Sequence, residues 1–304
     1  SQSAQAVYQE IVWPSLTSIA SRTGAKMTCM MTPQFTYTDE EEPDGENVTY
    51  YLKRLKEEHA EAGLSADSRE GILLSEKIKQ DQTFWQTYAP SYRFLSLYAD
   101  GVKSIGEESA LPAEIRTVAL GSGASGQAVG YLNENVTLQP STSSGIRHTF
   151  LDDFKVKCME TALGYSNITP DLYSVTYPEG DDDSWEKMSK KIAANLGTYW
   201  KAYEAFDATT LTESDVRIRR FLALDYKQQR AGNVITLSLE HREDAAWFLL
   251  RLHGEKVTEV AGGSFEEIED GVYLILAEED EVSVEVQNGE TWQYQDGGKC
   301  GDGT

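Results

Sequence analysis

Short apolar runs alternate with longer amphipathic segments along the first two thirds of the chain. This alternation is typical of βα units arranged around a mostly parallel sheet or barrel. The apolar runs predict strands at 26–34, 60–66, 92–99, 116–122, 136–140 and 172–178. Hydrophobic residues recur at helical spacing between them and predict helices at 46–60, 74–89 and 184–206.

Beyond about residue 212 the period of the apolar residues changes from helical to alternating. Short β-rich stretches follow one another, separated by turn residues, and predict antiparallel strands. The first of them is 216–226. We therefore expect a (β/α) barrel over 1–211, an antiparallel β-sandwich over 212–293 and a disordered Gly-rich tail over 294–304.

The stretch AAWFLLRL places Trp247 and Leu249 on one face of a strand and Phe248 and Leu250 on the other. Because side chains alternate along a strand, one of these two pairs packs the core. An alternative is a face that stacks on carbohydrate, formed by Trp247, Phe248, Trp292 and Tyr294.

The charge balance restricts the partners of the chain. Among 304 residues, 50 Asp and Glu oppose 27 Lys and Arg, which gives a net charge of −23. Such a surface repels nucleic acid and anionic membranes, so no nucleic acid partner is expected. A neutral polysaccharide or a cationic amino sugar polymer fits this charge. The acidity is also compatible with a role in solubility alone.

Cysteine and histidine are scarce. The 3 Cys and 4 His are scattered, without the spacing of a disulfide framework or a zinc site. The glycine-rich stretch GSGASGQAVG lacks the Lys of a phosphate-binding loop. The sequence thus predicts neither a metal nor another cofactor. Because the first residue is not Met, we expect an excised part of a longer exported protein.

The expected strand ends carry polar and aromatic residues. Ligands of a (β/α) barrel lie over the carboxyl ends of its strands, where loops carry function without disturbing the core. Carboxylates, amides, hydroxyls and Tyr rings suit hydroxyl-rich sugars. The candidates are Gln34, Tyr37, Asp39, Ser65, Asp67, Tyr98, Asp100, Gln139 and Asp182. A pocket lined by Tyr37, Tyr98 and Trp185 would favour sugar binding, so Trp185 is a further candidate.

The motifs MTPQFTYTDEEEPDG, AEAGLSAD, YRFLSLYADG and WFLLRLHGEKV give the chain a family resemblance. It resembles the polysaccharide deacetylase (chitooligosaccharide deacetylase-like) superfamily, and within it a bacterial family of unknown function found alongside exopolysaccharide machinery. The resemblance implies acids at Asp39 and Glu40 and substrate contacts at Arg93 and Tyr98. The metal-binding His pair of the superfamily becomes Ser65 and Arg69, which cannot replace neutral imidazoles on a metal.

We therefore expect a protein of the cell envelope or extracellular space that binds an exopolysaccharide without metal-dependent catalysis. An enzymatic alternative is a metal-independent glycoside hydrolase that uses two strand-end carboxylates, drawn from Asp39, Asp67, Asp100 and Asp182. A third possibility is an assembly protein whose acidic surface docks a basic partner in a polysaccharide secretion complex.

Overall fold

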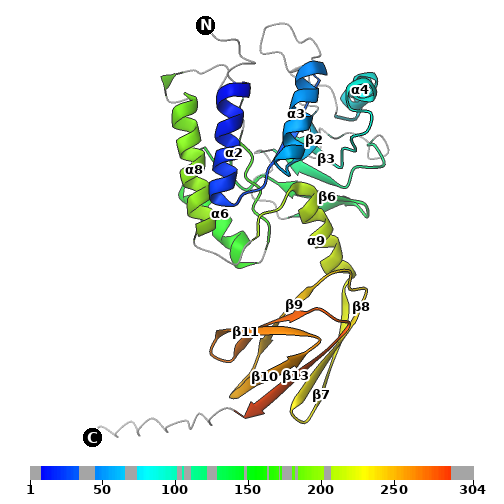
Figure 1. Ribbon diagram of the computed structural model, residues 1–304, viewed down its shortest axis with the longest axis vertical. Coiled ribbons are helices and arrows are strands. Elements are labelled where there is room, and N and C mark those ends of the chain that lie inside the picture. Colours follow the sequence, from blue (N-terminus) through cyan, green and yellow to red (C-terminus); the bar gives the residue numbers. More distant parts are fainter. Residues whose placement is uncertain are drawn as a thin grey trace, which may run out of the picture. The chain divides into compact units, whose positions relative to one another are not determined.

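The computed structural model divides the chain into two compact units, residues 1–215 and 216–304 (Figure 1). The structure describes residues 8–33, 45–65, 74–100, 105, 111–121, 129–146, 149–162, 164–170, 172, 180–181, 184–201 and 207–288.

The N-terminal unit contains a six-stranded sheet in the order β1-β2-β3-β4-β6-β5. All neighbouring strands are parallel except β5 and β6, which are antiparallel. The strands are β1 (Thr28–Met31), β2 (Glu61–Ser65), β3 (Ser96–Ala99), β4 (Thr117–Leu120), β5 (Gly130–Asn133) and β6 (Val136–Pro140). Within the described residues the sheet is open, with β1 and β5 at its edges.

Five of the predicted strands are confirmed, and 136–140 is found with the expected bounds. Strand β5 was not predicted because its sequence GYLN is short and half polar. Most of the predicted strand 172–178 lies outside the described residues. The expectation of a mixed α/β unit with a parallel sheet is confirmed, whereas closure into a barrel stays a prediction.

Helices surround this sheet, and the three predicted ones are confirmed. A π-helix, η1 (Tyr8–Val12), runs directly into α2, and α2 and α8 lie side by side (Figure 1). The helices are α2 (Trp13–Thr23), α3 (Gly45–Glu57), α4 (Leu74–Tyr88), α6 (Phe150–Thr161), α8 (Trp185–Lys201) and α9 (Leu211–Ala223).

One face of the parallel sheet is apolar and covered by helices. Every second residue of β1 to β4 and of β6 points to this side, and the set includes Cys29, Met31, Ala62, Leu64, Leu97, Ala99, Val118, Leu120, Val136 and Leu138. Val48, Tyr51 and Leu55 of α3 pack against the β1 and β2 part of it. Ile78 and Trp85 of α4 pack against the β3 and β4 part. Burial of these residues holds the helices to the sheet.

The opposite face of the same sheet is polar. The alternate positions are Thr28, Met30, Glu61, Gly63, Ser65, Ser96, Tyr98, Thr117, Ala119, Thr137 and Gln139. Because side chains alternate along a strand, the division into a mainly apolar and a mainly polar set favours one register for β1 to β4 and β6. The polar side chains of the sheet therefore lie mainly on one side.

The C-terminal unit consists of two antiparallel sheets that share one core. One sheet has the order β10-β13-β8-β7 and the other β11-β12-β9. Buried residues of both sheets, such as Ile235, Val284 and Ile275, form a single cluster. The strands are β7 (Asp225–Ala231), β8 (Val234–Glu240), β9 (Ala246–Arg251), β10 (Glu255–Ala261), β11 (Gly263–Glu269), β12 (Val272–Ala277) and β13 (Glu281–Asn288).

The predicted strand at 216–226 was wrong. Residues 211–223 form helix α9, and strand β7 begins only at Asp225. The alternation of Val216, Arg217, Ile218 and Arg219 imitates a strand. A helix-starting signal upstream, at Thr210, decides the conformation instead. The division between the two units, after Asp215, falls within α9.

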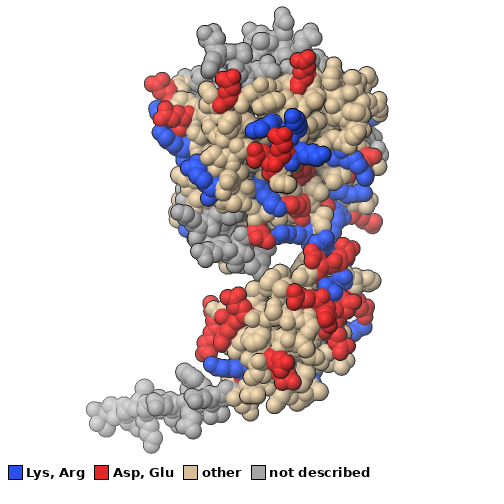
Figure 2. Space-filling model, in the orientation of Figure 1, with Lys and Arg blue, Asp and Glu red and all other residues tan. Residues whose placement is uncertain are grey.

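Charged side chains are distributed differently over the two units. In the view of Figure 2, basic and acidic residues are interspersed on the N-terminal unit, whereas acidic residues predominate on the C-terminal unit. Glu266, Glu267 and Glu269 of β11 and the turn Glu278 to Asp280 contribute to this excess.

Candidate functional site

The polar face of the parallel sheet contains a carboxylate with several donors at its amino edge, where the strands begin. Glu61, the first residue of β2, accepts hydrogen bonds from Ser96 Oγ (2.7 Å) and Thr28 Oγ1 (3.3 Å). It also accepts the backbone N–H of Thr212 at 3.0 Å and the hydroxyl of Thr212. A carboxylate at the N-terminus of a helix also interacts favourably with the helix dipole. Glu61 thus joins β1, β2, β3 and α9.

Helix α9 begins with a capping box at Thr210 and Glu213. The Glu213 N–H donates to Thr210 Oγ1 at 3.3 Å, and the Thr210 N–H donates to Glu213 Oε2 at 2.9 Å. The next N–H group, that of Leu211, donates to Thr28 Oγ1 at 3.0 Å. Because Glu61 accepts the N–H of Thr212, the first three N–H groups of α9 all find side-chain acceptors.

Gln139 belongs to the same structural network. Its Nε2 donates to Thr117 Oγ1 (2.8 Å) and to the carbonyl of Leu211 (3.0 Å), and its Oε1 accepts the hydroxyl of Ser214 (2.7 Å). The residue is 3% exposed. Both amide hydrogens are therefore used within the protein, which indicates that Gln139, a predicted sugar contact, instead positions α9 on the sheet.

At the carboxyl edge of the same polar face, a tyrosine pairs with an exposed carboxylate. Tyr98, near the end of β3, donates its hydroxyl to Oδ1 of Asp100 at 3.0 Å, and Asp100 is exposed. Directly after β4, a Cβ at Gly121 would lie 2.6 Å from the Tyr98 hydroxyl and 3.2 Å from Asp100 Oδ1. The absent side chain at Gly121 therefore makes room for the pair. Ser65, at the end of β2, pairs in register with Tyr98.

The predicted residues are thus only partly assembled. Ser65, Tyr98 and Asp100 lie at the carboxyl ends of adjacent strands, as expected. Five other candidates lie outside the described residues, namely Gln34, Tyr37, Asp39, Asp67 and Asp182. Of the four carboxylates of the hydrolase alternative, Asp100 alone therefore lies within the described residues.

Arg93 and Trp185 occupy other surroundings. Arg93 precedes β3, which begins at Ser96, and so lies towards the amino edge of the sheet, away from the end where Tyr98 and Asp100 meet. Trp185 opens α8 and packs against Ile19 and Ile192 in the cluster between α2 and α8. Arg93 was suggested by its place in the order of the sequence motifs. Because β3 begins only at Ser96, Arg93 lies before the strand and not at its carboxyl end.

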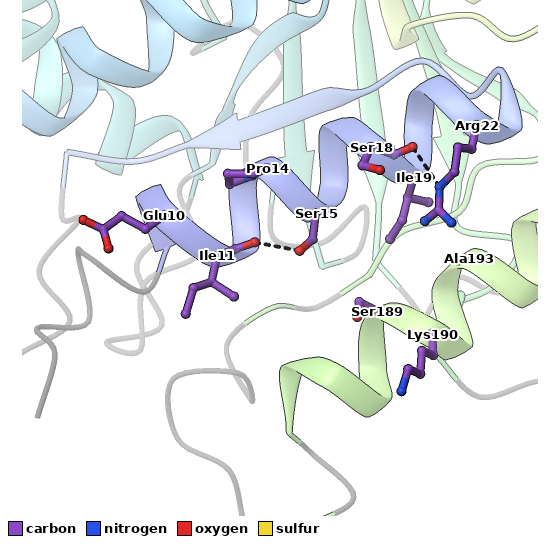
Figure 3. Close-up of a pocket in the computed structure, with 10 residues that line it drawn as sticks. All are labelled: Glu10, Ile11, Pro14, Ser15, Ser18, Ile19, Arg22, Ser189, Lys190 and Ala193. Carbon is purple, nitrogen blue, oxygen red and sulfur yellow. Dashed lines mark hydrogen bonds between the residues drawn. The ribbon is translucent and has the colours of Figure 1, made fainter.

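Two surface hollows occur in the described part of the N-terminal unit. One, of about 560 Å³, lies beside α4 before the start of β3 and β4 and includes Trp85, Tyr92, Arg93 and Phe94. The other, of about 540 Å³, is the groove between α2 and α8 shown in Figure 3. Neither is lined by Ser65, Tyr98 or Asp100.

The groove of Figure 3 is lined by polar groups that already bond within their helices. Ser15 donates its hydroxyl to the carbonyl of Ile11 at 2.7 Å, and Arg22 Nε donates to the carbonyl of Ser18 at 3.3 Å. Lys190 pairs with Glu186 at 2.7 Å. These contacts are those expected of two packed helices, so the groove adds no ligand-binding group to the candidate site.

Cys29 and Asp81, on the helix-covered side, have raised pKa values. Burial raises the pKa of the Cys29 thiol to about 11, so it stays protonated at neutral pH and is a poor nucleophile. Burial also raises the pKa of Asp81, although its hydrogen bond and ion pair with Lys77, at 2.8 Å, oppose the shift. Both groups belong to the packing of the unit and not to the carboxyl edge.

Within the part of the chain that the structure describes, no three His, Cys, Asp or Glu side chains gather as ligands for a metal ion. Among the described helices, none combines the length and apolar character needed to span a bilayer. Comparison with models of known protein families gave no match, and neither curated proteins nor solved structures gave a significant one.

The sequence analysis missed Glu61, Thr28 and the cap of α9, although signals for them exist. In EAGLS the polar residues Glu61 and Ser65 share a side with Gly63, while Ala62 and Leu64 face the other way. The spacing Thr210-x-x-Glu213 is that of a capping box. The strand was interpreted by its resemblance to a catalytic motif, which drew attention to its end and not to its first residue.

Proposed function

We propose that this chain is a carbohydrate-associated protein of the bacterial cell envelope or extracellular space, which binds an exopolysaccharide without metal-dependent catalysis. The ligand lies at the carboxyl edge of the parallel sheet. The observation that carries the proposal is the Tyr98–Asp100 pair beside Gly121. A hydroxyl, a carboxylate and an aromatic face together suit a sugar ring, because they offer both hydrogen bonds and an apolar contact.

The proposal includes a deacetylase-like (β/α) barrel followed by a β-sandwich. The spatial order β1-β2-β3-β4-β6 supports it. In a barrel, neighbouring parallel strands follow one another in chain order, whereas in a doubly wound sheet the strand order reverses at a switch point. The helices α3 and α4 both pack on the apolar face, as in a barrel that keeps its helices outside.

The charge of the chain favours one class of polysaccharide. The chain has a net charge of −23 and an exposed carboxylate at Asp100. It should therefore attract a partly deacetylated amino sugar polymer and repel an anionic polymer. We therefore expect ammonium groups on the sugar to strengthen binding, and added salt to weaken it.

Isothermal titration of the whole chain with two sugars tests this function. The probes are a chitosan hexamer, which carries free amino groups, and the fully N-acetylated chitin hexamer. We expect Asp100→Asn to weaken chitosan binding at least about tenfold, which is the loss of one charged contact. Tyr98→Phe removes the donor to Asp100 and should weaken binding by a smaller factor.

Glu114→Gln provides the matched control, because Glu114 is exposed and precedes β4 at the other edge of the sheet. It removes the same charge and should leave binding unchanged. Equal binding by wild type and Asp100→Asn contradicts the site. Release of reducing ends from either sugar, lost in Asp100→Asn, would instead support the glycoside hydrolase. Absence of binding to both sugars and to neutral exopolysaccharides would favour an assembly protein.

A further inference from the structure

The outer face of the three-stranded sheet in the C-terminal unit is unusually apolar. Strand β9 turns Phe248 and Leu250 towards the core, where both pack against the buried cluster. It turns Trp247 and Leu249 outward, where they are 61% and 50% exposed. Of the two pairs in AAWFLLRL, the Phe248 pair thus packs the core, and the Trp247 pair lies at the surface.

The central strand, β12, is apolar on both sides. Tyr273, Ile275 and Ala277 are buried in the core. Their outward neighbours are opposite the exposed residues of β9, since Leu276 pairs with Trp247 and Leu274 pairs with Leu249. We call the set Trp247, Leu249, Val272, Leu274 and Leu276 the Trp247 face. Ile268, at an irregularity in β11, is also 50% exposed.

The outer face of the other sheet in the same unit is mainly polar, as expected of a face in water. The outward positions of β8 and β13 are mainly polar and include Thr236, Ser238, Ser283 and Glu285, while Ile235, Leu237, Val282 and Val284 are buried. Antiparallel sheets with one face in water show this alternation. The Trp247 face departs from it, and contiguous exposed apolar patches mark interaction surfaces.

Charged residues that have no ion pair within the described part of the chain flank the Trp247 face on both sides and indicate which partner fits it. Arg251 lies outward at the end of β9, opposite Val272, and Glu266 and Glu269 lie outward on β11, across β12 from it. These three form no ion pair with any residue that the structure describes. By contrast, Arg230 and Arg242 of the same unit pair with Glu255 and Asp280. The face therefore has one basic and one acidic side, each without a counter-charge.

We propose that the Trp247 face is a self-association surface, occupied by the same face of a second copy of this chain. A two-fold axis parallel to the strands places β9 of each copy over β11 of the other. Arg251 of each copy then faces Glu269 of the other, and Glu266 lies in the next row of paired residues. An axis across the strands would instead place the acidic residues of β11 over one another. The charge pattern therefore fixes the orientation. This inference is independent of the proposed sugar site.

The size of the face sets the expected strength. Three strands about 4.8 Å apart and six residues long cover an area of about 14 by 20 Å. This is below the roughly 800 Å² per partner of a standard stable interface. We therefore expect a weak dimer, with a dissociation constant in the micromolar range, that forms at high local concentration.

Sedimentation velocity of the whole chain between about 5 and 500 µM tests the inference. We expect reversible dimerisation that Trp247→Ser with Leu249→Ser weakens at least about tenfold, which is a loss of two apolar anchors. Arg251→Glu and Glu269→Arg should each weaken it alone. An equimolar mixture of these two variants should restore dimers, because each introduced charge then faces an opposite charge on the other chain. Glu285→Arg, on the outer face of the other sheet, is the matched control.

Three results would overturn the inference. The first is a chain that stays monomeric throughout this concentration range, and the second is a dimer that Trp247→Ser with Leu249→Ser leaves intact. The third is a mixture of Arg251→Glu and Glu269→Arg that associates no better than either variant. A chitosan hexamer that changes tryptophan fluorescence in a monomeric wild type, but not in Trp247→Ser, would assign the face to a glycan instead.

Discussion

Glu61 and Asp100 are two carboxylates on the polar face of one sheet, and they differ in the hydrogen bonds that they accept from the protein. Glu61, at the amino edge, accepts hydrogen bonds from Thr28, Ser96 and Thr212. Asp100, at the carboxyl edge, is exposed and accepts the hydroxyl of Tyr98. A polar residue type on a strand therefore does not by itself indicate function. What matters is how much of its bonding capacity the fold already uses.

The largest expected effect is that of removing Glu61. In Glu61→Ala the N–H of Thr212 and the hydroxyl of Ser96, which is fully buried, lose their acceptor. Orphaned buried donors and a lost helix cap together cost about 3 kcal/mol. Urea unfolding should show this loss in the free energy of unfolding. An unchanged curve would mean that α9 is held to the sheet by other contacts.

A smaller effect is expected from removing one partner of Glu61. Thr28→Val keeps the shape of the side chain but takes away the acceptor of the Leu211 N–H and one donor to Glu61. We expect a loss of about 1 kcal/mol in urea unfolding, as for an N-cap substitution. The same change at Thr236, on the outer face of β8, should cost less than about 0.5 kcal/mol. Equal losses at the two sites would contradict the network.

Asp81 extends the comparison to a third carboxylate, buried on α4 and paired with Lys77. Burial raises its pKa in the folded state. The stabilisation from the bound proton is therefore fully present below the ordinary pKa of Asp and is lost as pH rises through the raised value. Above the ordinary pKa of Asp, about 3.9, the unfolding free energy should fall more steeply with pH in wild type than in Asp81→Asn. Parallel pH profiles would contradict the shift.

The smallest effect on stability is expected at Asp100. Because the carboxylate is exposed, Asp100→Ala should change the free energy of unfolding by less than about 0.5 kcal/mol. The same variant should nevertheless bind the chitosan hexamer more weakly. Loss of stability comparable to that of Glu61→Ala would show that Asp100 belongs to the fold and would remove the contrast between the two edges.

The sequence predicted the fold best where one physical signal dominates. Val136 to Pro140 is a β-rich run between turns, and the amphipathic pattern of Val48, Tyr51 and Leu55 has no competing interpretation. Prediction failed where two signals compete. At Val216 to Arg219 the alternation suggested a strand, but the capping box at Thr210 and Glu213 had already started a helix.

The candidate site was less accessible to sequence reasoning than the fold. Strand ends identify Ser65, Tyr98 and Asp100, because parallel strands bring their carboxyl ends to one edge. The roles of Gln139 and Glu61 depend on α9, more than 70 residues later in the chain than Gln139. No local pattern shows that a helix of distant sequence will use their hydrogen bonds.

Helix α9 has a practical consequence for dissecting this protein. Its first turn supplies the donors for Glu61, while its later residues belong to the other unit, where Arg220 pairs with Asp244. Leu224, directly after the helix, packs in the core of that unit. A truncation between Asp215 and Val216 would therefore damage both fragments. Fragments intended to fold alone should each retain the whole segment from Thr210 to Leu224. The N-terminal fragment then keeps the donors to Glu61, and the C-terminal fragment keeps Leu224 in its core.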